Sequence, residues 1–182
     1  MPFYGGLATA DGGSTGYSRR AAAFMANFEC NGEPHFLLTR RTNEVCTHNG
    51  QISFSGGMQL HGESLQQTSL REIFEEVGIE EDSIEILGRF HGCLSANGDA
   101  AALFVSFING IFVVVPQKSG VAEVLSVSLG IFADPSRLRI EKLFHSGSTI
   151  DAYYYHCESH EIWGLTAHII KDFLAVLAQE GS

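Results

Sequence analysis

The sequence has few cysteines, and none lie close enough together to suggest a disulfide framework or a zinc site. Its four cysteines, Cys30, Cys46, Cys93 and Cys157, stand singly and form no Cys-x-x-Cys pair. The simpler interpretation is four reduced thiols, mostly buried, in a reducing compartment. We therefore expect a cytoplasmic protein, and the matrix of an organelle is also compatible with this pattern.

The chain also lacks a long uninterrupted hydrophobic run. Its longest apolar segment, residues 100–115, is interrupted by a serine, an asparagine and a glycine, so it is too short to span a bilayer. The first 16 residues hold five glycines and no apolar core of the kind a secretory signal needs. We expect residues 1–20 to form a flexible glycine-rich arm, and we expect no membrane contact.

Positive charge is scarce, with 11 Lys and Arg residues against 21 Asp and Glu residues and a net charge of −10. This balance argues against a protein held on nucleic acid by bulk electrostatics. Small phosphorylated ligands stay compatible, because they need only local cations or a metal. A length of 182 residues with 45% hydrophobic residues predicts one globular domain, which we place at residues 21–178.

The hydrophobic patterns predict a mixed α/β domain. Strands are predicted over residues 21–29, 35–39, 51–54, 84–90, 101–108, 111–115 and 124–129, and helices over residues 65–77 and 166–179. Asn109-Gly110 is a strong signal for a two-residue hairpin between two of these strands. A mixed sheet with a helix on either side follows, which is an α/β/α sandwich.

The predicted helix at residues 65–77 concentrates negative charge. Glu72, Glu75 and Glu76 fall within about 100° of arc, opposite the apolar residues of the same helix. Like charges at this spacing cost about 0.2–0.5 kcal/mol per pair. A solvated face would tolerate that cost and is the simpler alternative. A divalent cation with oxygen ligands would remove the repulsion and would indicate phosphate chemistry.

The surrounding residues favour the cation. Gly56 and Gly57 precede the helix by a short loop, and glycines there allow the backbone to approach another group closely. Glu63 stands just before the helix. Arg71 adjoins the acidic cluster.

The spacing of these residues resembles the signature box of the Nudix hydrolases. Gly57, Glu63 and the run at residues 71–79 match all nine specified positions of that box. The resemblance implies a Nudix-type α/β/α sandwich that hydrolyses a nucleoside diphosphate linked to another moiety, with Mg²⁺ or Mn²⁺ as cofactor. It also implies a small nucleotide as substrate, and it allows a homodimer.

The same resemblance implies a role for each charged residue. Glu72, Glu75 and Glu76 would bind the metal, and Arg71 would hold a carboxylate in position rather than touch substrate. Glu63 would support the loop before the helix or reach a second metal. The general base stays open between Glu72 and a later residue, Glu123, for which a solvated loop residue is the simpler interpretation.

A second resemblance lies upstream and points to one branch of the family. Residues 37–57 resemble the extra motif of the coenzyme A pyrophosphatase branch. That motif reads LLTxRSx3Rx3Gx3FPGG, and the segment agrees with eight of its eleven specified positions. It implies that Arg40, Arg41, Gly56 and Gly57 contact substrate. The segment at residues 162–167 also resembles that branch.

Three residues depart from this pattern. Thr42 keeps the hydroxyl of a serine, and Ser55 replaces a proline, which we expect to loosen the turn without removing chemistry. Cys46 replaces an arginine, so a cation is lost unless Arg40, Arg41 or Lys118 compensates. These three departures affect the choice of substrate and leave the residues of the Nudix box unchanged.

Coenzyme A or acyl-coenzyme A, cut to 3′,5′-ADP and (acyl-)phosphopantetheine, is therefore the leading substrate. A pyrophosphatase for ADP-ribose, a nucleotide sugar or a dinucleotide is the alternative within the enzyme class. The alternative outside it is a non-catalytic module that binds a nucleotide, which we would expect to have lost its acidic cluster. An enzyme that removes the cap of RNA would need a basic stripe that the sequence lacks.

Overall fold

The computed structural model describes residues 20–42, 50–94, 100–116, 120–145 and 148–180. The predicted N-terminal arm lies outside these residues except for Arg20, which begins the first strand. Cys46 and Lys118, which bear on the choice of substrate, also lie outside them.

The strands are β1 (Arg20–Cys30), β2 (Glu33–Arg41), β3 (Ile52–Ser53), β4 (Ser55–Met58), β5 (Ile84–Leu94), β6 (Ala100–Ile108), β7 (Val121–Ser128), β8 (Leu138–His145), β9 (Ser148–Cys157) and β10 (His160–Trp163). The α-helices are α1 (Leu65–Val77), α2 (Leu129–Ala133) and α3 (Gly164–Glu180), and short 3-10 turns span η1 (Glu81–Ser83) and η2 (Pro135–Arg137). Where residues 51–54 were expected to form one strand, Phe54 separates β3 from β4.

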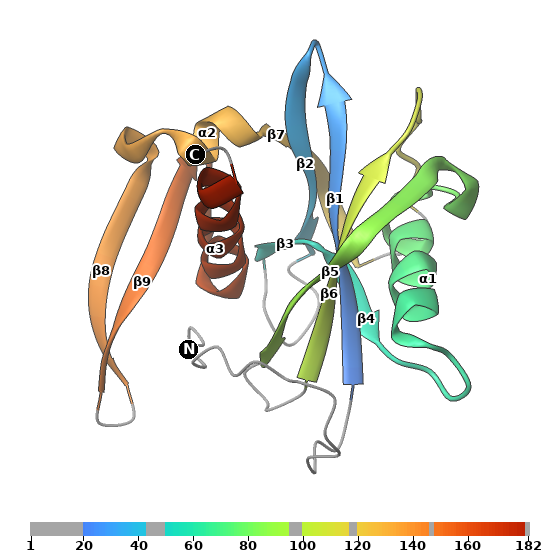
Figure 1. The fold of residues 1–182 in the computed structure, drawn as a ribbon, viewed down its shortest axis with the longest axis horizontal. Coiled ribbons are helices and arrows are strands. Elements are labelled where there is room, and N and C mark those ends of the chain that lie inside the picture. The colour runs from blue at the N-terminus through green and yellow to red at the C-terminus, as the bar shows by residue number, and fades with distance from the viewer. Residues whose placement is uncertain (1–19, 43–49, 95–99, 117–119, 146–147, 181–182) are drawn as a thin grey trace.

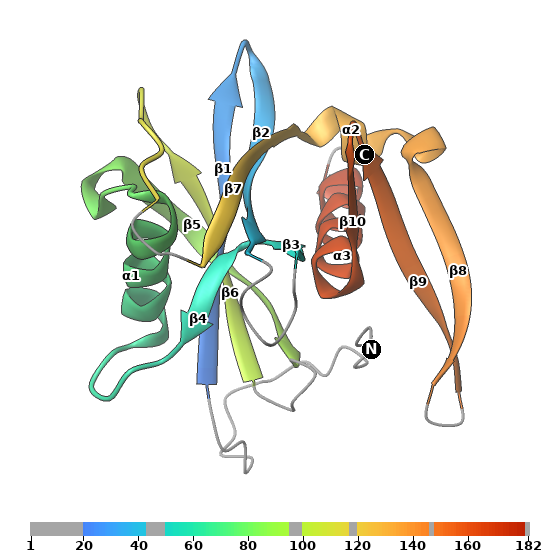
Figure 2. The same ribbon diagram turned by 180° about the vertical axis from the view of Figure 1, so that it is seen from behind.

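The main sheet has seven strands and is mixed, as predicted. Its central path runs β3-β2-β1-β6-β5, with β4 paired to β1 and β7 paired to β2 (Figure 1). The β1 and β6 strands are parallel, and the other pairs are antiparallel. A smaller antiparallel sheet, ordered β10-β9-β8, lies beyond α3 (Figures 1 and 2).

One helix covers each face of the main sheet, because successive residues of β1 point to opposite faces. Phe24 and Phe28 pack in one buried cluster with Ile73 of α1. Met25 lies in the other cluster, which includes Ile170 of α3. The predicted α/β sandwich is therefore confirmed.

The α1 helix begins and ends where its sequence predicts. The Ser64 hydroxyl accepts the Gln67 backbone N–H at 3.1 Å, and the Gln67 side chain accepts the Ser64 backbone N–H at 2.8 Å. At the other end Gly78 has φ +77°, and its N–H donates to the Phe74 carbonyl at 2.8 Å. These bonds join residues within about one helical turn of each other, so the signals for both ends of α1 are encoded locally.

The predicted hairpin at Asn109-Gly110 is wrong. The β6 strand already has β1 on one edge and β5 on the other, so no edge is left for a hairpin partner. Residues 109–116 instead form no strand, and Val115 donates its N–H to the carbonyl of Val77 at the end of α1. Gly110 keeps the positive φ of a turn, at +75°. The turn at Gly110 therefore forms, but the residues after it run to the end of α1 instead of pairing with β6.

The prediction missed the hairpin of β8 and β9. It also began the last helix at residue 166, two residues late, since α3 starts at Gly164. Within the described residues, no helix is long and apolar enough to cross a membrane.

Candidate active site

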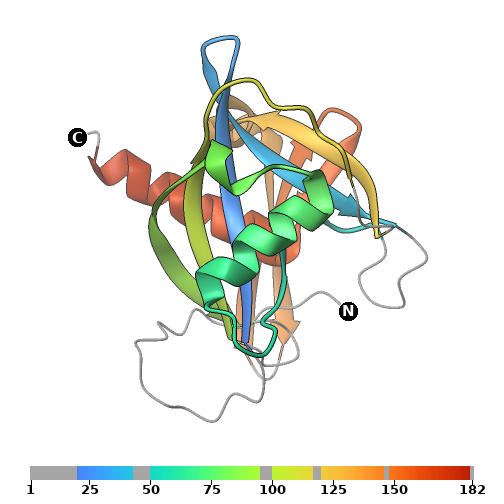
Figure 3. The ribbon, with the colours of Figure 1, turned by 90° about the vertical axis from the view of Figure 1, so that its right-hand side faces the viewer.

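Two of the three clustered glutamates are buried. Glu72 is 5% exposed and Glu76 is 6% exposed, whereas the Glu75 side chain is 37% exposed. Figure 3 shows α1 lying across the face of the main sheet. The alternative of a solvated acidic face is therefore wrong for Glu72 and Glu76. Buried carboxylates are expensive unless other groups compensate their charge, so their partners decide what this helix can do.

The two glycines of β4 allow a close approach, as predicted, but each to a different group. A Cβ atom on Gly57 would lie 2.2 Å from Oε1 of Glu72. A Cβ atom on Gly56 would lie 2.6 Å from the carbonyl oxygen of Ala22 and from Cβ of Ala23, both in β1. Gly56 thus lets β4 pack on β1, and Gly57 makes room for a buried carboxylate.

Arg71 holds several acceptors at once. Its Nε and Nη2 donate to the two oxygens of Glu63 at 2.7 and 3.2 Å. Its Nη1 donates to Glu72 at 2.7 Å and to Glu75 at 3.4 Å, and Nη2 also donates to the carbonyl of Met58 at 3.1 Å. These contacts match the five N–H donors of a guanidinium. Arg71 is therefore arranged to orient carboxylates, as the resemblance implies.

Glu63 ties the loop after β4 to the start of α1. Besides Arg71, its Oε2 accepts the N–H of Leu60 at 3.1 Å and the hydroxyl of Thr68 at 2.9 Å. Hydrogen bonding from Arg71 is the main cause that lowers the pKa of Glu63 to about 2. Both oxygens are engaged inside the protein. This geometry favours the supporting role of Glu63 over contact with a second metal.

Ser55 contacts Glu76, the second of the two buried glutamates. Its hydroxyl donates to Oε2 of Glu76 at 2.7 Å, and the N–H of Gly56 donates to the same oxygen at 3.3 Å. Ser55 is 3% exposed. We expected this residue only to loosen a turn, and the sequence alone offered no sign that its side chain reaches a glutamate 21 positions away.

Arg40 and Glu123 lie on neighbouring strands and pair with each other. Arg40 Nε donates to Oε2 of Glu123 at 2.8 Å, and Nε2 of His160 lies 3.2 Å from the same oxygen. The pKa of Glu123 is lowered, chiefly by the hydrogen bond from Arg40. Glu123 is therefore a paired residue of β7 and not the solvated loop residue that was the simpler interpretation. The sequence did not predict His160 as a partner of Glu123. Arg41, the other arginine predicted to contact substrate, is half-buried at the end of β2.

Comparison with known proteins decides the family. A model of the NUDIX domain family matches residues 18–117, which include α1 and β4. The chain belongs to the Nudix family. A Nudix hydrolase named NudL from Photorhabdus laumondii is 30% identical over 154 residues, which are 84% of this chain and 82% of that protein. NudL of Yersinia enterocolitica is 31% identical over 160 residues, 87% of this chain and 82% of that protein.

Solved Nudix structures share the fold. A MutT/nudix family protein from Enterococcus faecalis superposes with a TM-score of 0.57 and 18% identity, over 88% of this chain and 62% of that one. The Ap4A hydrolase of C. elegans superposes with a TM-score of 0.54 and 18% identity, over 60% of this chain and 80% of that one. The predicted enzyme class, a Nudix pyrophosphohydrolase, follows from this membership, while the names of the NudL relatives specify no substrate.

Nudix hydrolases generally use divalent metal ions, and the donor set here fits one. Glu63, Glu72 and Glu75 all contact the single guanidinium of Arg71, so negative charge exceeds positive charge around it. Among the described residues, no three His, Cys, Asp or Glu side chains already converge as a metal cage. Mg²⁺ does not require such a cage, because a few carboxylates hold it together with several waters and the phosphates of the substrate.

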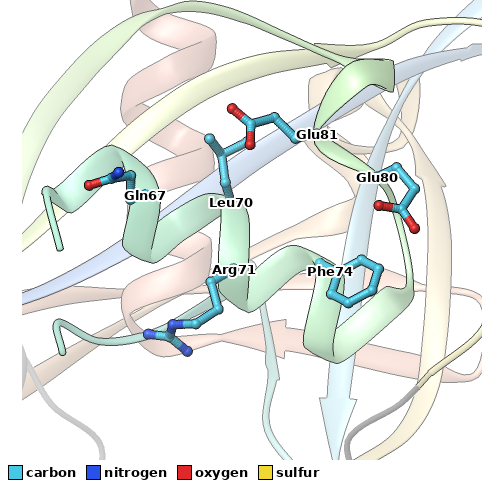
Figure 4. A pocket seen from close by; sticks show the side chains of 6 residues that line it. All are labelled: Gln67, Leu70, Arg71, Phe74, Glu80 and Glu81. Carbon is cyan, nitrogen blue, oxygen red and sulfur yellow. The ribbon is translucent and has the colours of Figure 1, made fainter.

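A shallow groove of about 270 Å³ lies beside α1 and does not include the buried carboxylates. Figure 4 shows its lining side chains, which are Gln67, Leu70, Arg71, Phe74, Glu80 and Glu81. Arg71 is already occupied by its own acceptors, and the groove adds two acidic side chains. An anionic phosphate is therefore not expected to bind in this groove.

Proposed function

We propose that this Nudix protein hydrolyses the pyrophosphate bond of a nucleoside diphosphate linked to another moiety, with Mg²⁺ or Mn²⁺ as cofactor. The observation that carries the proposal is the burial of Glu72 and Glu76 against the Gly56–Gly57 strand. A helix without a function at this face would have little reason to bury two carboxylates, because each is costly to remove from water. The intact acidic cluster also argues against a non-catalytic binding module.

The roles proposed for the residues come from the resemblance to the Nudix box, and the contacts of Arg71 support them. Glu72, Glu75 and Glu76 supply carboxylate oxygens to the metal, with Arg71 fixing two of them and Glu63 fixing Arg71. The bound metal would neutralise phosphate charge and lower the pKa of a water molecule. This division gives Arg71 and Glu63 no contact with substrate.

For the general base, Glu72 is the stronger candidate of the two that the sequence offers. It lies on α1 against Gly57, at the centre of the Nudix box. Hydrogen bonds from arginine do not separate the two candidates, because Arg71 donates to Glu72 at 2.7 Å and Arg40 donates to Glu123 at 2.8 Å. Glu72 is preferred because it lies within the Nudix box beside the other proposed metal ligands, whereas Glu123 lies on β7.

Coenzyme A or its acyl derivative is the proposed substrate, on the strength of the motif at residues 37–57. Coenzyme A carries a 3′-phosphate in addition to its pyrophosphate, so it needs more cationic contacts than ADP-ribose does. Cys46 stands where the pattern has an arginine, and Arg40 is engaged by Glu123. These two observations favour ADP-ribose, a nucleotide sugar or a dinucleotide as the second candidate.

A substrate panel tests the reaction. The protein is incubated with Mg²⁺ and coenzyme A, acetyl-coenzyme A, dephospho-coenzyme A, ADP-ribose, NADH, a UDP-sugar or a diadenosine polyphosphate, and the products are resolved by chromatography. Glu76→Gln serves as the inactive variant. Glu81→Gln is the matched control, because Glu81 is exposed on the turn that follows α1.

The proposal expects cleavage at the pyrophosphate, loss of activity with EDTA, and a loss of at least about 100-fold in Glu76→Gln with little change in Glu81→Gln. Preferential cleavage of coenzyme A over dephospho-coenzyme A would support a contact with the 3′-phosphate. Arg40→Ala and Arg41→Ala should then reduce that preference. Tight nucleotide binding without cleavage of any compound would refute the enzyme and favour a binding module.

A further inference from the structure

We infer that Ser55 is a positioning residue for Glu76, which it holds in the orientation needed to bind the metal. The inference rests on the proposed function, since it assigns Ser55 a part in that same site. The carrying observation is the 2.7 Å hydrogen bond from the Ser55 hydroxyl to Oε2 of Glu76, made where both side chains are almost fully buried.

Two donors hold one carboxylate oxygen. The Ser55 hydroxyl and the N–H of Gly56 both reach Oε2 of Glu76. Hydrogen bonds to an ionised acceptor are among the stronger ones in proteins, and two of them on one oxygen restrict rotation of the carboxylate plane. The orientation of the second oxygen, Oε1, is thereby set by β4 and not by solvent.

The donors themselves are anchored. Ser55 pairs with Phe24 and Gly56 pairs with Ala23 across the antiparallel β1–β4 ladder. A Cβ atom on Gly56 would lie 2.6 Å from atoms of Ala22 and Ala23, so β4 packs closely on β1 at this point. A chain of contacts therefore runs from the central strand through Ser55 to the helix carboxylate.

The Ser55 hydroxyl is a feature of this chain that the coenzyme A pyrophosphatase pattern lacks. The proline in the coenzyme A pyrophosphatase pattern has no side-chain donor and could not make this bond. The serine is thus more than a tolerated replacement, because it supplies a buried donor where the pattern has none. Partners of metal ligands commonly change metal affinity or activity by about 10- to 100-fold when removed.

Binding of Mn²⁺ tests this role without turnover. Electron paramagnetic resonance measures free Mn²⁺ during titration of the wild-type protein, Ser55→Ala, Ser55→Thr and Ser55→Val. Thr and Val have the same shape and differ in the hydroxyl, so any steric cost of the extra methyl is shared by the pair. Ser69→Ala is the matched control, since Ser69 is buried on α1 and donates to the backbone carbonyl of Gln66.

We expect Ser55→Ala and Ser55→Val to bind Mn²⁺ about 10-fold or more weakly than the wild-type protein and Ser55→Thr, respectively. Ser69→Ala should bind as the wild type does. Equal affinities within both pairs would overturn the inference while leaving the proposed function intact. Absence of Mn²⁺ binding by the wild-type protein would overturn both. Binding with the expected pattern but no hydrolysis of any substrate would refute the proposed function alone.

Discussion

Replacing Gly57 with alanine would separate the stability of the fold from the chemistry of its site. The added Cβ would lie 2.2 Å from Oε1 and 2.4 Å from Cδ of Glu72, whereas real contacts of this kind essentially never fall under 3.0 Å. The group that must move is the end of a flexible side chain. The backbone of β4 can therefore stay in place while the Glu72 carboxylate is displaced.

The expected cost differs between stability and activity. Displacing Glu72 weakens its 2.7 Å hydrogen bond with Arg71, so the free energy of unfolding should fall by about 1–2 kcal/mol. A misplacement of about 1 Å in a catalytic group can cost about 100-fold in rate. We therefore expect Gly57→Ala to stay folded and to lose about 100-fold in kcat/KM, which equals about 2.7 kcal/mol of transition-state stabilisation.

Two glycines provide the comparison. Gly56→Ala would meet backbone atoms of β1 at 2.6 and 2.8 Å, which cannot rotate away, so its main effect should be a loss of stability of about 1–3 kcal/mol or more. Gly88→Ala in β5 would meet no atom within 4 Å and should change neither property.

Urea denaturation gives the stability of each variant, and steady-state hydrolysis of the best substrate gives its kcat/KM. A folded Gly57→Ala variant with wild-type kcat/KM would refute the idea that the position of Glu72 matters. A Gly57→Ala variant as unstable as Gly56→Ala would refute the idea that only a side chain has to move.

Three further predictions concern other residues of the site and its helix. Arg71 lowers the pKa of Glu63 to about 2, so ionised Glu63 stabilises the fold above its ordinary pKa of 4.5 and loses that contribution as pH falls toward 2. The difference in the free energy of unfolding between wild type and Glu63→Gln, measured by urea denaturation from pH 7 to pH 2, should therefore shrink below pH 4.5. A constant difference over that range would contradict this. Glu123→Gln should lower the KM for coenzyme A, because it frees Arg40 to contact substrate, and should lower kcat by less than about tenfold, since loss of a true general base costs about 100-fold or more. A larger fall in kcat would restore Glu123 as the base. Gly78→Ala should lower the free energy of unfolding by about 1–2 kcal/mol, measured by denaturation, because its φ of +77° is strained for any other residue; unchanged stability would show that α1 does not need its glycine stop.

The acidic helix illustrates what can be predicted from sequence. The bounds of α1 were predicted, because its capping box and its glycine stop depend on bonds within a few residues. The Nudix box was found in the same stretch, since its spacing is fixed along one loop and one helix. Most strands of the main sheet were predicted in the same way, with ends displaced by a few residues, but β4 was not predicted and the strand expected at residues 111–115 does not form.

Other features depend on residues distant in the chain, and here the sequence was insufficient. Asn109-Gly110 is a genuine turn signal, yet both edges of β6 are taken by β1 and β5. The pairing of Arg40 with Glu123 spans 83 positions and follows from the register of β2 against β7. Neither outcome could be obtained from local patterns.

By itself, then, the sequence determined the reaction class, the acidic helix and the family of the protein, because all of these are encoded in short-range spacing. Only the tertiary structure decided that Glu72 and Glu76 are buried, that Gly57 makes room for one of them and that Ser55 holds the other. The physical reason is that burial and hydrogen bonding arise where β4 meets α1. The contact between β4 and α1 depends on how the whole sheet packs, so no single segment of the sequence predicts it.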